Sequence, residues 1–85
     1  MSEAVRFARA ARRALAEVLP ADVAAAVFEF CHGPLSSAPT KVGKPLLGKY
    51  DGQWVARRGE YRIRYRLEEH SIVVLDVQHR RDAYR

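Results

Sequence analysis

The sequence predicts an α+β fold in which an N-terminal strand and a helical hairpin pack on an antiparallel sheet of three strands, which the N-terminal strand is free to join. Three features of the sequence predict it. Apolar residues recur at three- and four-residue spacing in the first third of the chain, a strict alternation runs from Tyr61 to Leu67, and the almost wholly apolar segment Ile72 to Val77 follows. A chain of 85 residues can hold one hydrophobic core, so residues 1–85 are expected to form a single domain.

The helical hairpin is expected after a short strand that covers Ala4 to Ala8. The first helix covers Arg9 to Val18 and ends at Leu19-Pro20, because proline lacks an amide proton and disfavours helical geometry in the residue before it. The second helix has Asp22 in its first turn, where an anion is favourable, and is expected to end at Gly33-Pro34.

The segment from Leu35 to Gly52 shows no lasting periodicity and is rich in glycine and proline, so we expect a loop. All three lysines of the chain lie in it. Either they are simply solvated, or they contact phosphate groups. These lysines are Lys41, Lys44 and Lys49.

The last third of the chain is expected to form a three-stranded meander. Its strands cover Gln53 to Arg57, Tyr61 to Leu67 and Ile72 to Val77, with turns at Arg58-Gly59-Glu60 and Glu68 to Ser71. Simple alternation in the last strand predicts one set of side chains facing the core and another facing outward. The inward set is Val73, Leu75 and Val77, and the outward set is Asp76, Gln78 and Arg80.

Arginine dominates the basic charge of the chain. The formal net charge is +5, from 15 Lys and Arg against 10 Asp and Glu, and only three of those 15 are Lys. A guanidinium can hold phosphate through two parallel hydrogen bonds, which suits a polyanion ligand. A genome rich in G and C would favour arginine codons equally well. Only the positions of the arginines can therefore indicate whether they serve a polyanion ligand.

The lone cysteine, Cys31, cannot form an internal disulfide and has no metal-binding spacing around it. It falls on the apolar face of the second helix, where a small core residue is expected. No apolar run is long enough to span a bilayer or to serve as the core of an export signal. The sequence therefore predicts a cytoplasmic protein without a membrane segment, a metal or a cofactor.

The alternating strand places its arginines on one face. Residues two apart in a strand lie roughly 6.8 Å apart on the same side, so Arg62, Arg64 and Arg66 form a row. A solvated sheet face would explain the row. Alternatively, Arg62 and Arg80 converge from neighbouring strands on one phosphate, where they could stabilise charge that develops during cleavage.

Two residues near the C-terminus could assist RNA cleavage. His79 titrates near neutral pH and could move a proton, and Tyr84 offers a ring on which a base can stack. Each has a structural alternative. Histidine at a strand end is often structural, with alternation pointing His79 toward the apolar side, and Tyr84 could pack over a sheet edge.

The order of these features resembles the RelE/ParE superfamily of bacterial toxins, on its RelE side, along essentially the whole chain. The resemblance is carried by Gly43-Lys44-Pro45-Leu46 before the sheet, by Trp54 leading to Arg57-Arg58-Gly59-Glu60-Tyr61-Arg62, and by His79-Arg80-Arg81-Asp82-Ala83-Tyr84. It implies two helices on one side of a four-stranded antiparallel sheet. It also implies ribosome-dependent cleavage of mRNA through a 2′,3′-cyclic phosphate, and neutralisation by a RelB-like or Phd/YefM-like antitoxin protein in a hetero-oligomer.

The resemblance also assigns roles to residues. Arg62 and Arg80 would stabilise phosphate charge, and Tyr84 would stack on or orient the substrate. Familiar members carry lysines on the strand before Arg62, yet here that strand, Gln53 to Arg57, has none, so His79 could take a proton-transfer role. The remaining expected substrate-binding residues are Arg57, Arg58, Arg64, Arg81, Lys41, Lys44 and Lys49.

Two other functions fit the same fold. A ParE-like toxin would poison DNA gyrase without cutting RNA, although such toxins usually lack the set of Arg62, Arg80 and Tyr84. A nucleic-acid-binding protein or inactive homologue would produce no growth defect.

Overall fold

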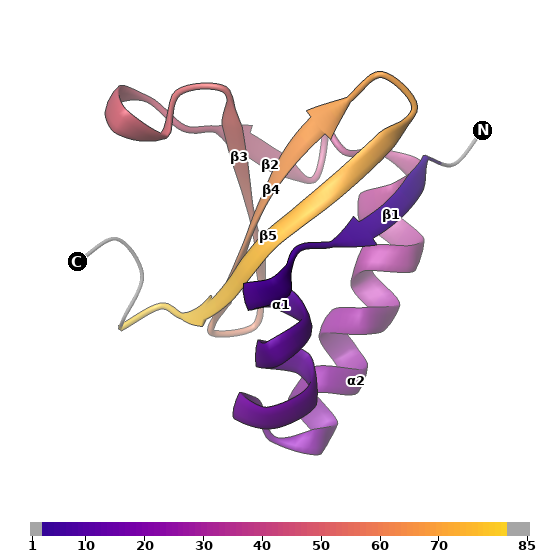
Figure 1. The fold of residues 1–85 in the computed structure, drawn as a ribbon, viewed down its shortest axis with the longest axis vertical. Helices are drawn as coiled ribbons and strands as arrows, with labels where there is room; N and C mark the ends of the chain where they lie inside the picture. The colour runs from indigo at the N-terminus through magenta and orange to yellow at the C-terminus, as the bar shows by residue number, and fades with distance from the viewer. Residues whose placement is uncertain (1–2, 82–85) are drawn as a thin grey trace.

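A five-stranded sheet with the strand order β1-β5-β4-β3-β2 organises the chain, and both helices lie on one side of it (Figure 1). The computed structural model describes residues 3–81. The strands are β1 (Ala4–Phe7), β2 (Gly43–Pro45), β3 (Gln53–Arg58), β4 (Tyr61–Glu68) and β5 (Ser71–His79).

The N-terminal strand joins the sheet in the parallel direction. Strand β1 pairs with β5 in a parallel register that runs from Ala4 opposite Ser71 to Phe7 opposite Val74. The expectation of a purely antiparallel sheet of three or four strands is therefore wrong in direction and count, whereas the α+β class is confirmed. Alternation reports which face a side chain takes but not which way the strand runs, and β5 has one edge left after pairing with β4.

Each helix begins as an α-helix and ends in a wider π-helical turn. Helix α1 (Arg9–Arg13) continues as η1 (Ala14–Val18), and α2 (Ala21–Phe30) continues as η2 (Cys31–Leu35). The first helix therefore ends where Leu19-Pro20 predicted. The second does not end at Gly33-Pro34, because Cys31 and Leu35 are both fully buried and their packing carries the helical path past the proline.

The expected loop from Leu35 to Gly52 contains two short regular segments. Strand β2 pairs antiparallel with β3, with Gly43 opposite Ala56 and Pro45 opposite Trp54. A 3₁₀ turn, η3 (Gly48–Tyr50), follows it. A three-residue strand is too short to show a period, which is why the sequence predicted only a loop there.

A β-bulge between β4 and β5 changes which residues face the core. Arg64 pairs with Asp76 but the next residue, Tyr65, pairs with Val74, so Leu75 is an extra residue on β5. Alternation was therefore wrong for Val73, which pairs with Arg66 on the opposite face of the sheet.

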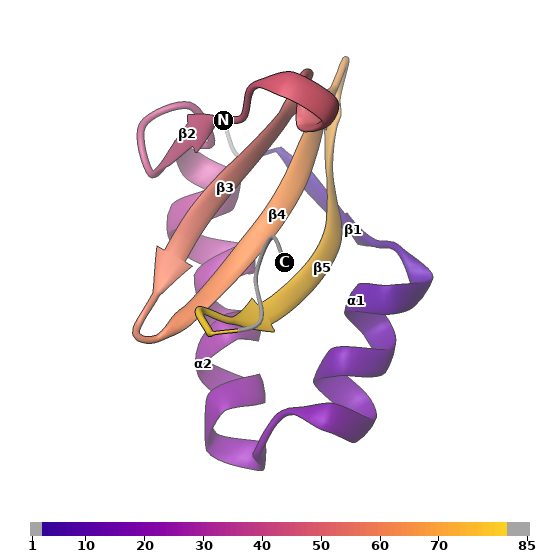
Figure 2. The same cartoon turned by 90° about the vertical axis from the view of Figure 1, so that its left-hand side faces the viewer.

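The core lies between the helices and one face of the sheet. Val27 and Cys31 from α2 and η2 pack there with Ile63, Tyr65 and Val74, and all five are at most 1% exposed. Helices leave the other face uncovered, and β3, β4 and β5 lie in front of them in Figure 2. Within residues 3–81, no helix is long and apolar enough to cross a membrane.

Candidate functional site

The uncovered face of the sheet carries most of the arginines of β3 and β4. Residues paired directly across neighbouring strands project from the same face, so the register defines rows of side chains on it, and two of these rows lie nearest β2 and the β3–β4 turn. One row is Lys44, Val55, Arg64 and Asp76, and the other is Arg57, Arg62 and Gln78.

A basic groove of about 470 Å³ opens where these rows approach β2. Four of the residues that line it are cations contributed by separate parts of the chain, and none of the lining residues within 3–81 is acidic. The groove therefore offers a positive site for a polyanion such as a phosphodiester backbone. Its lining is Lys41, Val42, Gly43, Lys44, Leu46, Val55, Arg57 and Arg62.

The fully buried Tyr65 fixes the lysine-bearing side of this groove. Its hydroxyl donates a hydrogen bond to the carbonyl oxygen of Pro39, and burial raises its pKa to about 12, which keeps the donor proton in place. The hydroxyl passes so close to Gly43 that a Cβ there would lie 2.1 Å from it. A glycine and a tyrosine thus hold the segment that carries Lys41 and Lys44 against the sheet.

Other arginines of the alternating strand are engaged by acidic residues. Arg64 Nη2 lies 2.6 Å from Asp76 Oδ2, and its guanidinium lies over the Tyr50 ring at 5.1 Å. Arg66 Nη2 lies 2.9 Å from Glu68 Oε2 in a more exposed pair. Arg64 and Arg66 are absent from the lining of the basic groove, so the three arginines of the row are not equivalent.

The end of β5 carries a second charged cluster, centred on Glu60 in the β3–β4 turn. Arg80 Nη2 lies 3.6 Å from Glu60 Oε1, and His79 Nε2 lies 3.5 Å from Glu60 Oε2. His79 pairs with Tyr61 and meets its ring edge-on, with 5.2 Å between the ring centres. His79 therefore lies on the face of Tyr61, as simple alternation indicated, and not in the row of Arg57, Arg62 and Gln78.

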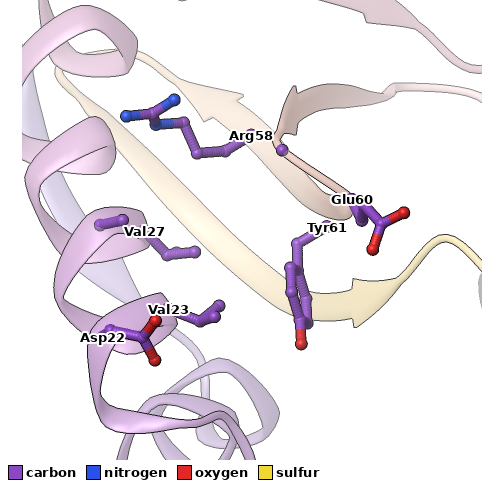
Figure 3. Close-up of a pocket in the computed structure, with 8 residues that line it drawn as sticks. Asp22, Val23, Val27, Arg58, Glu60 and Tyr61 are labelled. Carbon is purple, nitrogen blue, oxygen red and sulfur yellow. The ribbon is translucent and has the colours of Figure 1, made fainter.

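Three further expected substrate-binding residues, Arg58, Lys49 and Arg81, are not among the residues that line the basic groove. The Arg58 side chain points toward α2 (Figure 3), where it lines a separate pocket of about 310 Å³ with Asp22 and Val27. Lys49 lies over the Tyr50 ring at 5.3 Å, and the amide N–H of Arg81 donates to His79 Nδ1. Tyr84 lies outside the described residues.

The sequence did not single out two acidic residues that organise these clusters. Asp76 was expected to face outward but was not matched with Arg64, because the bulge that aligns them was not foreseen. Glu60 was assigned only to a turn, although its position two residues before Arg62 could have drawn attention to it. Among residues 3–81, no group of three or more His, Cys, Asp and Glu side chains could hold a metal ion.

Comparison with known proteins gives a consistent family. Residues 5–84 match the family model described as the ParE toxin of the type II toxin-antitoxin system parDE. Toxin RelG of Mycobacterium tuberculosis is 49% identical over an 87-residue alignment that covers 100% of this chain and 99% of the relative. Toxin RelE of the same organism is 39% identical over 69 residues, covering 79% of this chain and 71% of the relative.

The fold agrees with a solved relative. The structure of the M. tuberculosis toxin-antitoxin complex RelBE2 contains a chain that superimposes with a TM-score of 0.87 and 44% sequence identity, over 93% of this chain and 99% of that one. The match with the family model and the identity to RelG each extend over nearly the whole chain. The chain therefore belongs to the RelE/ParE family of toxins from type II toxin-antitoxin systems.

Proposed function

We propose that this toxin is a ribosome-dependent mRNA endoribonuclease that inhibits translation in the cytoplasm. The observation that carries the proposal is the basic groove, in which the cations Lys41, Lys44, Arg57 and Arg62 all line one space. The names of the relatives RelE and RelG support the RelE side of the family.

The reaction would be an internal transesterification. The ribose 2′-oxygen attacks the adjacent phosphorus, the bond from phosphorus to the 5′-oxygen breaks, and a 2′,3′-cyclic phosphate and a free 5′-hydroxyl result. Negative charge grows on the phosphoryl oxygens in the transition state, so fixed guanidinium groups aimed at them lower the barrier. No cofactor is needed for this chemistry.

Arg62 and Arg80 are the proposed stabilisers of that charge. Arg62 is paired with Gln78, and the ladder continues past β5 because the Arg80 amide donates to the Glu60 carbonyl oxygen at 2.8 Å. Diagonal neighbours on adjacent strands lie about 7 to 8 Å apart, which two long side chains can bridge to one phosphate. Lys41, Lys44 and Arg57 would then hold flanking phosphates of the message, with Tyr84 stacking on a base.

The proton-transfer group is constrained by the contacts of His79. Its Nδ1 accepts a hydrogen bond from the Arg81 amide at 3.2 Å, so in this arrangement the proton is on Nε2. A neutral imidazole is far too weak an acid to give its Nε2 proton to the departing 5′-oxygen, so His79 must first gain a second proton on Nδ1 to act as the acid. Both this role and abstraction of the 2′ proton therefore require the Arg81 amide to release Nδ1.

The proposed partner is an antitoxin protein, since the solved relative was determined as a toxin-antitoxin complex. A RelB-like antitoxin fits this relative, and a Phd/YefM-like antitoxin is the alternative. An acidic, amphipathic segment would complement the basic groove and block access of RNA.

Primer extension on RNA from an induced culture tests the nuclease. Wild type is expected to produce new 5′ ends inside translated messages, and Arg62→Ala to reduce their rate of formation by roughly 10²-fold or more. Arg66→Ala is the matched control, because Arg66 pairs with Glu68 and does not line the groove. Absence of new 5′ ends in the wild-type culture refutes the nuclease.

Gyrase inhibition is the second candidate, because the matching family model is described as a ParE toxin. It predicts gyrase-dependent DNA damage in the same induced culture, with intact messages. An inactive homologue predicts neither damage nor slower growth.

A further inference from the structure

We infer that Glu60 is a positioning residue that holds Arg80 and His79 for the reaction, an inference that rests on the proposed ribonuclease function. Glu60 lies in the turn between β3 and β4, directly after Gly59, whose φ of 63° is in the left-handed region that glycine adopts freely. This turn brings Glu60 beside the last residues of β5.

Three contacts link Glu60 to the end of β5. Its carbonyl oxygen accepts the Arg80 amide N–H at 2.8 Å, its Oε1 lies 3.6 Å from Arg80 Nη2, and its Oε2 lies 3.5 Å from His79 Nε2. The two carboxylate oxygens thus serve different partners. Glu60 also lines the pocket at α2, but Figure 3 shows its carboxylate directed away from α2 and from Arg58.

His79 is held on its other sides as well. The Arg81 amide donates to Nδ1 at 3.2 Å, and the Tyr61 ring meets the imidazole edge-on at 5.2 Å. With Nδ1 accepting, the Nε2 proton faces the Glu60 carboxylate. Glu60 therefore completes the set of contacts that fixes the direction of the proton-bearing nitrogen.

Arg80 has more need of such support than Arg62 does. Arg62 lies within β4, whereas Arg80 follows the last residue of β5 and its side chain is 55% exposed. A long arginine side chain outside a strand has many rotamers, and each rotamer that misses the substrate phosphate lowers the rate. The Glu60 carboxylate favours those Arg80 rotamers that keep the guanidinium at the end of the arginine-bearing face.

The charge of Glu60 makes this role separable from substrate binding. A carboxylate repels a phosphodiester, so removing it cannot weaken substrate binding through the loss of an attraction. Loss of Glu60 should therefore lower kcat, through less ordered Arg80 and His79, while KM stays unchanged or falls. Loss of a residue that binds substrate would raise KM instead.

The test compares Glu60→Gln with wild type in cleavage of mRNA on programmed ribosomes, with kcat and KM measured separately. Glu60→Gln keeps the size of the side chain and is expected to lower kcat roughly tenfold, because one exposed ion pair with Arg80 and the contact of the carboxylate with His79 Nε2, both of modest strength, are lost. Glu69→Gln is the matched control, since that side chain is 90% exposed and lies in a different turn. Thermal unfolding confirms that both variants remain folded.

An independent readout follows the two side chains themselves. Nitrogen NMR of the wild-type chain should show His79 with the proton on Nε2, and Glu60→Gln should shift both the His79 imidazole and the Arg80 guanidinium signals, whereas Glu69→Gln should not. Unchanged signals in Glu60→Gln would overturn the inference.

The kinetic outcomes separate the two proposals. If wild type cleaves and Glu60→Gln cleaves with the same or a higher kcat, Glu60 does not position the site and only this inference fails. If wild type cleaves no message, the ribonuclease function is refuted and the inference falls with it.

Discussion

Replacing Asp76 with alanine is expected to destabilise the protein by about 2 kcal/mol, because the change leaves a partly buried arginine without its carboxylate. Asp76 Oδ2 lies 2.6 Å from Arg64 Nη2, and the two side chains are only 19% and 22% exposed. The Nε of Arg64 is also buried and has no hydrogen-bond partner within the described part of the chain. Loss of Asp76 would leave Arg64 Nη2 without its carboxylate acceptor as well.

The magnitude follows from the burial of the pair. Breaking a fully buried ion pair costs about 3 to 5 kcal/mol, and exposed pairs contribute roughly 0 to 1 kcal/mol. A pair that keeps about one-fifth of its exposure lies between these limits. In a domain of this size each kcal/mol shifts Tm by roughly 4 to 8 °C, so Asp76→Ala should lower Tm by about 8 to 16 °C.

The assay is a double-mutant cycle by urea unfolding, with Asp76→Ala, Arg64→Met and the double variant. Methionine keeps much of the apolar length of arginine, so the double variant should recover part of the loss. The matched control is the pair Arg66 and Glu68, whose side chains are 47% and 38% exposed.

The control pair should couple by at most about 0.5 to 1 kcal/mol, since solvent screens exposed charges. Equal coupling energies for the two pairs, or a stronger coupling for Arg66 with Glu68, would refute the reasoning that burial makes the difference. Greater tolerance of Asp76→Ala than of Glu68→Ala would refute it in the same way.

Two further predictions concern the packing around the groove and the core. Gly43→Ala should destabilise the protein and weaken RNA cleavage, because the new Cβ would lie 2.1 Å from the Tyr65 hydroxyl, whereas Gly33→Ala, which meets nothing within 4 Å, should be close to neutral in thermal unfolding. Burial raises the pKa of Cys31 from 9.0 to about 12, so the unfolded chain loses this proton first and stability should fall as pH rises from about 9 toward 12. Urea unfolding at several alkaline pH values checks this, and Cys31→Ala should flatten the decline, although the raised pKa of Tyr65 leaves part of it. If the stability of Cys31→Ala fell with alkaline pH as steeply as that of wild type, ionisation of Cys31 would not be the cause of the fall.

The sequence was most informative where one period persisted over many residues. The alternation in Tyr61 to Leu67 predicted β4 and its arginine-bearing face, and the breaker Leu19-Pro20 predicted the junction between the helices. In both cases a strong local signal agreed with the tertiary packing, which is the condition under which sequence patterns are reliable.

The sequence was least informative where structure depends on a distant partner. Nothing local to Gly43 encodes a strand, since β2 exists only because β3 offers it an edge. The bulge at Leu75 lies in an apolar run where alternation cannot be read, so the predicted inward position of Val73 was wrong. The groove inherits the first of these difficulties, because β2 supplies Lys44 to it.

The parallel pairing of β1 with β5 has a consequence for how the toxin is made. Residues 4–7 are synthesised long before their hydrogen-bonding partners, residues 71–74. Contacts of such long sequence separation form late and slow down folding. In the nascent chain, the apolar side chains of Val5 and Phe7 therefore lack their sheet neighbours until β5 has been synthesised, so the ribosome that makes the toxin does not face a finished toxin fold while it is still translating β5.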